Sequence, residues 1–418
     1  MGERVVIVGA GVAGLATACE LAAARLQPLV LEGRARVGGR VHTLSTGDGP
    51  PLELGAEFLH GLAPEVERFI REHHLAKRQV SDDHWRVREG VFEPLSDFWD
   101  LLAEVFDKIP KRGRDETYAE FVTKVRGVNE RTKTLANDFV EGFHAGNTRD
   151  ISVRSIVEAE EASAAVDGTK QFRFVAGYGE MVRAMHAKAV VGGARILLNH
   201  AVSRVEWRRG NVRVTARAGN EILHFDADGA VITLPVGVLQ AGSVVFDPQL
   251  PRQERAFASV AMGNVVKVNL ILRPGLWPDD KQGFLHLATE KFPTWWRNGS
   301  VVTAWVGGPK ADAHDSALVA INSALDSLSQ IFGRNARPFV ESAQFHNWRN
   351  DPFAYGAYSY VPVGGLNARR VLAQDVERTL FFAGEATAQP GFQGTVHGAV
   401  ESGLRAAREV LDARRRRR

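Results

Sequence analysis

The chain opens with apolar runs that change from strand spacing to helix spacing and back. Residues 4–8 (RVVIV) form a short apolar run typical of a buried strand, and residues 28–32 (PLVLE) form a second one. Between them, residues 12–25 are small and mostly apolar, as in a closely packed helix. This order predicts a βαβ unit, so the chain is expected to begin with a Rossmann-type nucleotide-binding fold.

From about residue 62 to 165 the pattern becomes helical, with apolar residues at helical spacing in PEVERFIREHH, SDFWDLLAEVF and ERTKTLANDFVEGF. Strand patterns return at 195–235, where they predict a meander and one more strand of the nucleotide-binding domain. Further on, the pattern predicts two strands, a helix, a short buried strand and a last helix, at residues 264–273, 300–306, 314–332, 380–384 and from about 395.

These patterns predict an α/β protein whose two domains are interleaved along the chain. The nucleotide-binding domain is assigned residues 1–61, 170–245 and 366–418. The second domain, of mixed α+β type, is assigned residues 62–169 and 246–365, and its first segment is expected to form a helical lobe.

Composition narrows the class of protein. With 418 residues, 44% of them hydrophobic, the chain can bury a full core. No run approaches the roughly 18 apolar residues of a membrane helix, and no cationic leader precedes the first strand, so we expect a cytoplasmic protein without a membrane contact. Cys19 is the only cysteine, which excludes an internal disulfide and a cysteine-based metal centre. We expect no metal, and redox chemistry would need an organic cofactor.

The basic character of the chain comes from its end. The formal charge is +3, but removing the five arginines of residues 414–418 from the 52 basic residues leaves 47 against 49 acidic residues. Such a terminal run is most often a solvated, frayed end. No specific nucleic-acid partner is therefore expected.

A glycine-rich turn follows the first strand. Gly9, Gly11 and Gly14, with Val12 and Ala13, form a GxGxxG motif that opens the predicted helix. Gly9 permits the tight turn, Gly11 lets a pyrophosphate approach the helix N-terminus, and Gly14 allows close packing. Glu32 ends the second strand, where a carboxylate accepts hydrogen bonds from the adenosine ribose. The motif predicts a dinucleotide site.

A second glycine pair indicates which dinucleotide. Gly38 and Gly39 lie between Arg34 and Arg40, so the backbone can pass close to a ligand while two guanidinium groups offer hydrogen bonds to a diphosphate. A nicotinamide site has no use for this second clamp. The segment favours FAD over NAD.

Seven blocks, in this order, resemble the flavin-containing amine oxidases, which include monoamine oxidases, polyamine oxidases and lysine-specific histone demethylases. They cover nearly the whole chain and read GAGVAGL, GGRVHT, LELGAEFLHG, FVAGYGEMV, GNVVKVNL, WRNDPFAYGAYSYV and FFAGEATAQPGFQGTVHGAVESG. The resemblance implies the two-domain amine-oxidase fold and FAD as cofactor. It implies hydride transfer from the α-carbon of an amine to flavin N5, and reoxidation by O2 to give H2O2 and an imine that hydrolyses to an aldehyde. It also implies non-covalent FAD, because Ala357 stands where monoamine oxidases carry the cysteine that bonds the flavin.

The resemblance assigns further cofactor contacts. Thr395 and Val396 open the last helix, whose N-terminus would face the flavin pyrimidine edge, and the carboxylate of Glu385, after Gly384, would bind the ribityl chain. Val205 matches the valine that meets adenine. A loop that passes the flavin, with Glu57 serving mainly through its backbone, is assigned Gly55, Ala56, Glu57 and Phe58.

The catalytic assignment also comes from the resemblance. Lys267 would hold a water against flavin N5, whereas its residue pattern alone also fits an edge-strand lysine that reaches solvent. Tyr358 would form the aromatic wall beside the flavin, while Trp348, assigned to the cofactor site, is as well explained by packing. His60 would accept a proton from the substrate ammonium. Thr395 replaces the second tyrosine of monoamine oxidases, as in polyamine oxidases.

Several alternatives stay open at this point. The substrate is expected to be a small amine, with a polyamine slightly favoured over an aromatic or aliphatic monoamine. A distal cation of such a substrate would face Glu158, Glu160 and Glu161 if that segment lines the entrance. Another FAD enzyme of the same architecture, such as a desaturase or protoporphyrinogen oxidase, and a flavin-binding protein without turnover are the rivals.

Overall fold

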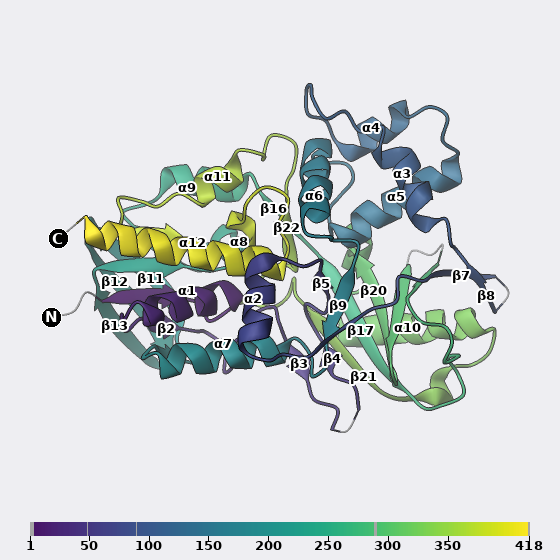
Figure 1. Cartoon of the computed structure of the whole chain (residues 1–418), viewed down its shortest axis with the longest axis horizontal. Helices are drawn as coiled ribbons and strands as arrows, with labels where there is room; N and C mark the ends of the chain where they lie inside the picture. Colours follow the sequence, from purple (N-terminus) through teal and green to yellow (C-terminus); the bar gives the residue numbers. More distant parts are fainter. Residues whose placement is uncertain (1–3, 48, 89, 288–290, 417–418) are drawn as a thin grey trace.

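A five-stranded parallel sheet forms the centre of the first domain, on the left of Figure 1. The structure, a computed structural model, describes residues 4–47, 49–88, 90–287 and 291–416. In spatial order the strands are β10 (Arg195–Leu197), β2 (Leu29–Leu31), β1 (Val5–Val8), β14 (Gly229–Ile232) and β23 (Leu380–Phe382). Helix α1 (Val12–Ala23) connects β1 to β2, which confirms the predicted βαβ unit.

Each face of this sheet has its own core, because alternate residues of β1 point to opposite sides. Val5 and Ile7 pack with α1, α7 (Gly179–Val191) and α12 (Val396–Arg415), and α1 lies against α12 in Figure 1. Val6 and Val8 pack with a second sheet. That sheet holds the predicted meander and one further strand, β11 (Ala201–Arg208), β12 (Asn211–Ala218), β13 (Glu221–Ala227) and β15 (Val245–Asp247).

The glycine turn has the geometry that the motif requires. Gly9 has φ +105°, which side chains rarely adopt, and its N–H bonds to the carbonyl of Leu31 at 2.8 Å. Gly11 is the N-cap of α1 with an extended backbone, and a Cβ placed there would meet nothing within 4 Å. A Cβ on Gly14 would lie 2.0 Å from the carbonyl oxygen of Gly9. Gly14 therefore serves packing, and Gly11 leaves open space at the helix N-terminus.

The second domain is built on a seven-stranded mixed sheet, on the right of Figure 1. Its strands, in spatial order, are β21 (Val340–Asn347), β17 (Val265–Leu272), β20 (Val301–Gly307), β19 (Thr294–Asn298), β18 (Phe284–His286), β7 (His84–Arg88) and β8 (Val91–Pro94). Helix α10 (Ala317–Phe332) covers one face. The predicted strands at 264–273 and 300–306 and the helix at 314–332 are confirmed.

Strand β17 shows why this sheet carries a site. It pairs with β20 on one side and β21 on the other, so it is an interior strand. Val266, Val268 and Leu270 join the core that includes α10. Lys267 and Asn269 alternate with them and therefore point to the opposite face, yet each is only 1% exposed. The second face of the sheet is thus polar and buried.

The helical lobe lies above this sheet in Figure 1 and contains α3 (Phe98–Phe106), α4 (Tyr118–Lys124), α5 (Glu130–Phe143) and α6 (Val153–Ala165). Thr117, Asn129 and Ser152 cap α4, α5 and α6 through their side-chain oxygens.

The lobe is smaller than the predicted 62–169. Helix α2 (Pro64–Glu72) packs on the first domain, because its apolar residues Val66, Phe69 and Ile70 share one face that joins that core. Of residues 77–94, those that the structure describes are not helical; they include β6 (Lys77–Gln79) as well as β7 and β8.

Short elements connect these layers. They are β3 (Thr43–Leu44), β4 (Leu52–Glu53), β5 (Leu59–His60), β9 (Gln171–Phe174), β16 (Ala261–Gly263), β22 (Tyr358–Tyr360), α8 (Val236–Gln240), α9 (Pro251–Ala258), α11 (Ala368–Leu372), η1 (Gly308–Ala313), η2 (Arg337–Phe339) and η3 (Glu385–Thr387). Within the described ranges, none of the helices has the length and apolar character that crossing a membrane demands. The first two of the terminal arginines belong to α12, so the run is not frayed throughout, and residues 417–418 lie outside the described residues.

Gly11 and Gly14 should respond differently to substitution by alanine. Gly14→Ala should lower the free energy of unfolding by roughly 1–3 kcal/mol, because the new methyl group overlaps the Gly9 carbonyl. Gly11→Ala is the matched control and should cost about 1 kcal/mol or less, since its Cβ enters open space. Urea denaturation of both variants measures this, and equal losses would contradict the packing assigned to Gly14.

Candidate functional site

One cavity of about 1290 Å³ joins the two domains. It begins at the glycine turn, passes the segment at residues 54–60 and Lys267, and continues between the helical lobe and the seven-stranded sheet. Ligand cavities of roughly 300–1,000 Å³ hold a drug-sized molecule. This one therefore has room for an elongated cofactor and a second, smaller molecule.

At the first end of the cavity a carboxylate is held in a fixed position. Glu32, 6% exposed, accepts hydrogen bonds from the backbone N–H of Ala10 (2.7 Å, Oε2) and of Arg34 (2.9 Å, Oε1). Each oxygen keeps acceptor capacity for a ligand hydroxyl. Gly9, Gly11, Val12 and Ala13 line this end, with the N-terminus of α1 open beside them. The residues present fit a dinucleotide.

The position of Val205 does not agree with the adenine contact expected for it. Val205 is 0% exposed, lies in the core between the two sheets of the first domain, and is not among the described residues that line the cavity. Val202, from the same strand, lines the cavity. A β-bulge lies between Val202 and Arg204, so the two valines do not follow the regular alternation of a strand.

The two arginines expected at a diphosphate already have carboxylate partners. Arg34 forms a two-pronged pair with Asp351 (2.7 Å for each bond), and Arg40 bonds to Glu385 (2.9 Å) and to the carbonyl of Ala357 (2.8 Å). Burial would raise the pKa of Asp351, but hydrogen bonds from His346 and Arg34 outweigh it and hold that pKa well below its usual range. Arg34, Gly38, Gly39 and Arg40 line the cavity, and both arginines also tie the two domains together.

At the C-terminal seat the expected residues converge. Glu385 is 5% exposed and accepts hydrogen bonds from Arg40, the Ser359 hydroxyl (2.6 Å) and the Gly394 N–H (2.9 Å), so protein groups already hold the carboxylate expected to bind a ligand chain. Thr395 accepts from the Gly398 N–H at 3.0 Å and so caps α12. Gly384, Glu385, Thr395 and Val396 line the cavity, and the positive end of the α12 dipole faces it.

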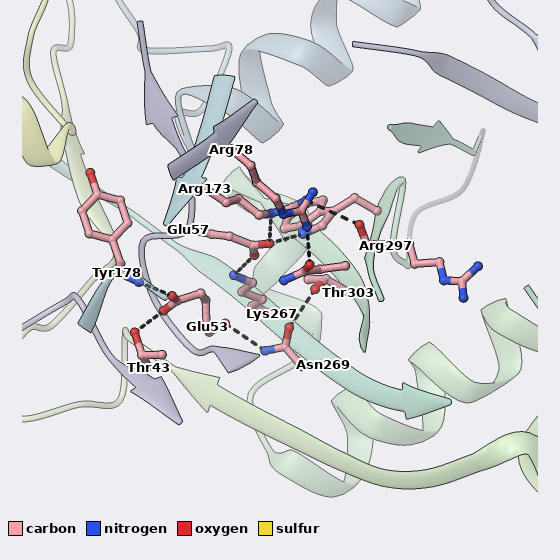
Figure 2. A network of polar contacts seen from close by, with 12 residues as sticks. Thr43, Glu53, Glu57, Arg78, Arg173, Tyr178, Lys267, Asn269, Arg297 and Thr303 are labelled. Atoms are coloured by element: carbon pink, nitrogen blue, oxygen red, sulfur yellow. Dashed lines mark hydrogen bonds and ion pairs between the residues drawn. The ribbon is translucent and has the colours of Figure 1, made fainter. Parts of the chain in front are cut away.

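Lys267 lies in the middle of the cavity wall and is engaged by a buried anion (Figure 2). Its Nζ donates to Glu57 Oε2 at 2.5 Å and to the carbonyl of Gly55 at 3.3 Å. The edge-strand interpretation is wrong, because β17 is interior and Lys267 is 1% exposed. The carboxylate of Glu57 is taken up by protein groups, and its expected backbone contact with the flavin stays a prediction. Gly55, Ala56, Glu57 and Phe58 all line the cavity, as predicted for this loop.

Two partners of Glu57 were not predicted. Arg173 donates from Nε (2.8 Å) and Trp296 from Nε1 (2.9 Å), both to Glu57 Oε1. Burial alone would raise the pKa of Glu57, but the cations of Lys267 and Arg173 outweigh it and lower that pKa. Arg173 lies within β9 (QFRF) and is 4% exposed. The only signal in the sequence is a charged residue between two phenylalanines.

Tyr358 and His60 stand on the aromatic wall. Tyr358 donates its hydroxyl to the carbonyl of Phe143 at 2.9 Å, and burial raises its pKa. The ring of His60 lies edge-on to Phe143, with centroids 5.6 Å apart. Burial lowers the pKa of His60 to about 4, so the imidazole is neutral at pH 7. Trp348 donates to the carbonyl of Leu54 at 3.0 Å and is 3% exposed.

The far part of the cavity was not predicted residue by residue. Its aromatic side chains come from the helical lobe and from two strands of the large sheet, and they are His84, Phe98, Trp99, Phe139, Phe143 and His286. Phe98 stacks on His84, and the two imidazoles share a hydrogen bond of 2.8 Å. Helical spacing in SDFWDLLAEVF predicts the helix but does not say which side of it lines a cavity.

Of the three glutamates proposed for the entrance, Glu160 lines the cavity; its side chain is exposed to solvent, and desolvation by the surrounding protein raises its pKa. Glu158 instead pairs with the buried Arg369, and Glu161 lies 3.9 Å from Lys111. We call the part of the cavity lined by the aromatic side chains of the helical lobe and the large sheet the aromatic arm, and the part lined by α6 the polar arm.

Comparisons with known proteins agree with this geometry. The sequence profile of the family described as flavin containing amine oxidoreductase matches residues 12–411. A rice (Oryza sativa subsp. japonica) protein named lysine-specific histone demethylase 1 homolog 2 is 30% identical over 99% of this chain, and polyamine oxidase 2 of Arabidopsis thaliana is 29% identical over 97%. The chain spans 57% of the length of the first and 87% of the second.

The fold is that of a solved enzyme. A double mutant of putrescine oxidase superimposes with a TM-score of 0.81, covering 98% of this chain and 99% of its own, at 22% identity. A triple mutant of the same enzyme gives 0.79. The predicted interleaved α/β fold is therefore confirmed.

The buried carboxyl of Glu53 should make the free energy of unfolding depend on pH. It accepts hydrogen bonds from the Tyr178 N–H (2.6 Å) and the Thr43 hydroxyl (2.7 Å), and burial raises its pKa to about 7. Because the folded chain favours the protonated carboxyl, its contribution is present at low pH and lost as pH rises from about 4.5 to about 7. Glu53→Gln should remove up to about 3 kcal/mol of this loss. Denaturation midpoints across that range measure it, and equal pH slopes in both proteins would contradict the assignment.

Proposed function

The chain belongs to the flavin-containing amine oxidoreductase family, and from this premise we propose that it binds FAD non-covalently and oxidises small amines with O2 as acceptor. The observation that carries the proposal is the position of Lys267 in the wall of one continuous cavity, between the dinucleotide end and the aromatic wall. A nucleotide-binding protein without turnover has no need for a buried cation at that point.

The residues of the cavity support FAD. The open space at Gly11 and the N-terminus of α1 suit a diphosphate, and the fixed carboxylate of Glu32 suits a ribose. The capped N-terminus of α12 suits the edge of the flavin ring where negative charge develops on reduction. Bound flavin supplies the acceptor for the two electrons and the hydrogen that leave the α-carbon.

The chain's own residues prepare the amine. The substrate ammonium has to lose a proton before hydride can leave, and the neutral imidazole of His60 can accept a hydrogen bond from it without repelling it. Its pKa of about 4 makes His60 an orienting acceptor more than a base that retains the proton. The faces of Tyr358 and Phe143 flank the same region and exclude water.

We favour a di- or polyamine as substrate. Relatives named polyamine oxidase and a fold neighbour named putrescine oxidase support this, and so does Glu160, which could pair with a distal ammonium in the polar arm. Thr395 in place of a second tyrosine leaves a less enclosed cage.

The aromatic arm supports a second candidate. Phe98, Trp99 and Phe139 lie within 5.1–6.3 Å of one another, centroid to centroid, and could receive the ring of an aromatic monoamine.

The purified protein should be yellow, and acid precipitation should release FAD into the supernatant, because Ala357 offers no sulfur for a covalent bond. Gly11→Ala should keep its fold but retain FAD at least about tenfold more weakly, since the methyl group enters the space assigned to the diphosphate. Fluorescence titration of the stripped proteins with FAD measures this. A colourless protein that takes up no FAD would contradict the proposal that this chain binds FAD.

Peroxide release on an amine panel tests the substrate class. Putrescine, spermidine or spermine should show a higher kcat/KM than benzylamine or tyramine. Glu160→Gln should raise KM for the diamine about tenfold, the worth of one charge-assisted hydrogen bond, and leave kcat and benzylamine oxidation unchanged.

Glu161→Gln, a neighbour that does not line the described cavity, is the matched control. An aromatic monoamine as the best substrate, with Glu160→Gln indistinguishable from this control, would replace the polyamine assignment by the second candidate.

A further inference from the structure

The ammonium of Lys267 is held in place by hydrogen bonds to protein groups. Two of its three N–H groups are directed at Glu57 (2.5 Å) and at the Gly55 carbonyl (3.3 Å), which leaves one donor for the cavity that Lys267 lines. These two hydrogen bonds fix the direction of the nitrogen.

Glu57 is itself held from the side opposite Lys267 (Figure 2). Arg173 Nε and Trp296 Nε1 both donate to Oε1, so that Oε2 is left for Lys267. Every one of these side chains is buried: Glu57 is 9% exposed, Arg173 and Trp296 4%, and Lys267 1%. The carboxylate cannot rotate away without leaving two buried cations unpaired.

Other charged groups near Lys267 do not replace Glu57. Glu53 is occupied by Thr43 and Tyr178, and His346, opposite Lys267 in β21, pairs with Asp351. Arg78, close to Arg173, adds positive charge only. Glu57 is therefore the one carboxylate bonded to Lys267 in the part of the chain that the structure describes.

We infer that Glu57 is a positioning residue that keeps Lys267 protonated and aimed at the flavin, so that Lys267 acts during reoxidation as a fixed cation and not as a base. The inference rests on the proposed function. In reoxidation, O2 gains two electrons and two protons to become H2O2, while reduced flavin is oxidised. Negative charge builds on the oxygen before protonation is complete, and a cation already in place stabilises it without reorganisation.

A stability cycle on the FAD-free protein tests the pairing. Glu57→Gln keeps the size and the hydrogen-bond acceptor but leaves Lys267 and Arg173 as unpaired buried cations, so the denaturation midpoint should fall. The stability loss of Glu57→Gln should become smaller between about pH 6 and pH 9. In this variant Lys267 is more easily neutral when the chain is folded, so the folded chain binds fewer protons than the unfolded chain and gains stability as pH rises. Adding Lys267→Met should recover stability and abolish this pH dependence.

Stopped-flow reoxidation tests the chemistry. FAD-loaded protein reduced with dithionite is mixed with O2, and the wild-type rate constant should not change over the same range. In Glu57→Gln it should fall by up to about tenfold per pH unit above the point where Lys267 loses its proton. Lys267→Met should be slow at every pH, and Glu57→Asp, which keeps the charge but shortens the reach, should be slower than wild type with a flat profile.

Glu158→Gln is the matched control, because it removes the partner of buried Arg369 while Glu158 itself is not among the described residues that line the cavity. It should lower stability and leave the reoxidation profile unmoved. A wild-type rate and a flat profile in Glu57→Gln, together with additive stability losses in the cycle, would overturn the inference. Protein that binds FAD but oxidises no amine contradicts the proposed function alone, since dithionite supplies the electrons; protein that binds no FAD overturns both.

Discussion

A lysine that is almost completely buried needs an anion beside it, and this requirement of Lys267 determines which side chains surround it. Desolvating an ammonium costs several kcal/mol even after relaxation, which only a well-formed ion pair with further hydrogen bonds offsets. Glu57 provides the pair, and Arg173 and Trp296 satisfy the remaining oxygen of its carboxylate. Lys267 and these three side chains, which come from four separate segments of the chain, thus hold one another in place.

Those segments lie where the chain passes between domains. Glu57 stands just before β5, Arg173 belongs to β9, and β5 and β9 pair with each other between the two large sheets. Lys267 reaches them because β17 alternates apolar residues toward α10 with polar residues toward the other domain. The interleaved topology and the buried network therefore require each other: separate domains would leave this polar face without its partners.

Long periodic segments were predictable from the sequence, because local spacing determines them. The βαβ unit, the meander, β17, β20, α10 and α12 all follow from the 2- and 3.6-residue periods. The strands at residues 77–94 were missed because they are short and mostly half-exposed, so their pattern depends on the neighbouring strand and not on their own sequence. The surroundings of single side chains were less predictable still: Val205 lies in the core while Val202 lines the cavity, and Arg34 pairs with Asp351, more than 300 residues away along the chain.

Two sources of positive potential meet in the same cavity. One is the N-terminus of α12, a 20-residue helix capped by Thr395, whose dipole is carried by backbone amides that neither titrate nor move. The other is the Lys267–Glu57–Arg173 cluster, which holds two cations against one carboxylate. Because neither depends on a mobile ion or a solvent-exposed side chain, the field is in place before any negative charge appears. The two sources would act on different half-reactions: the helix dipole favours reduction of a ligand bound beside it, whereas under the inference drawn above Lys267 stabilises negative charge on the oxidant during reoxidation.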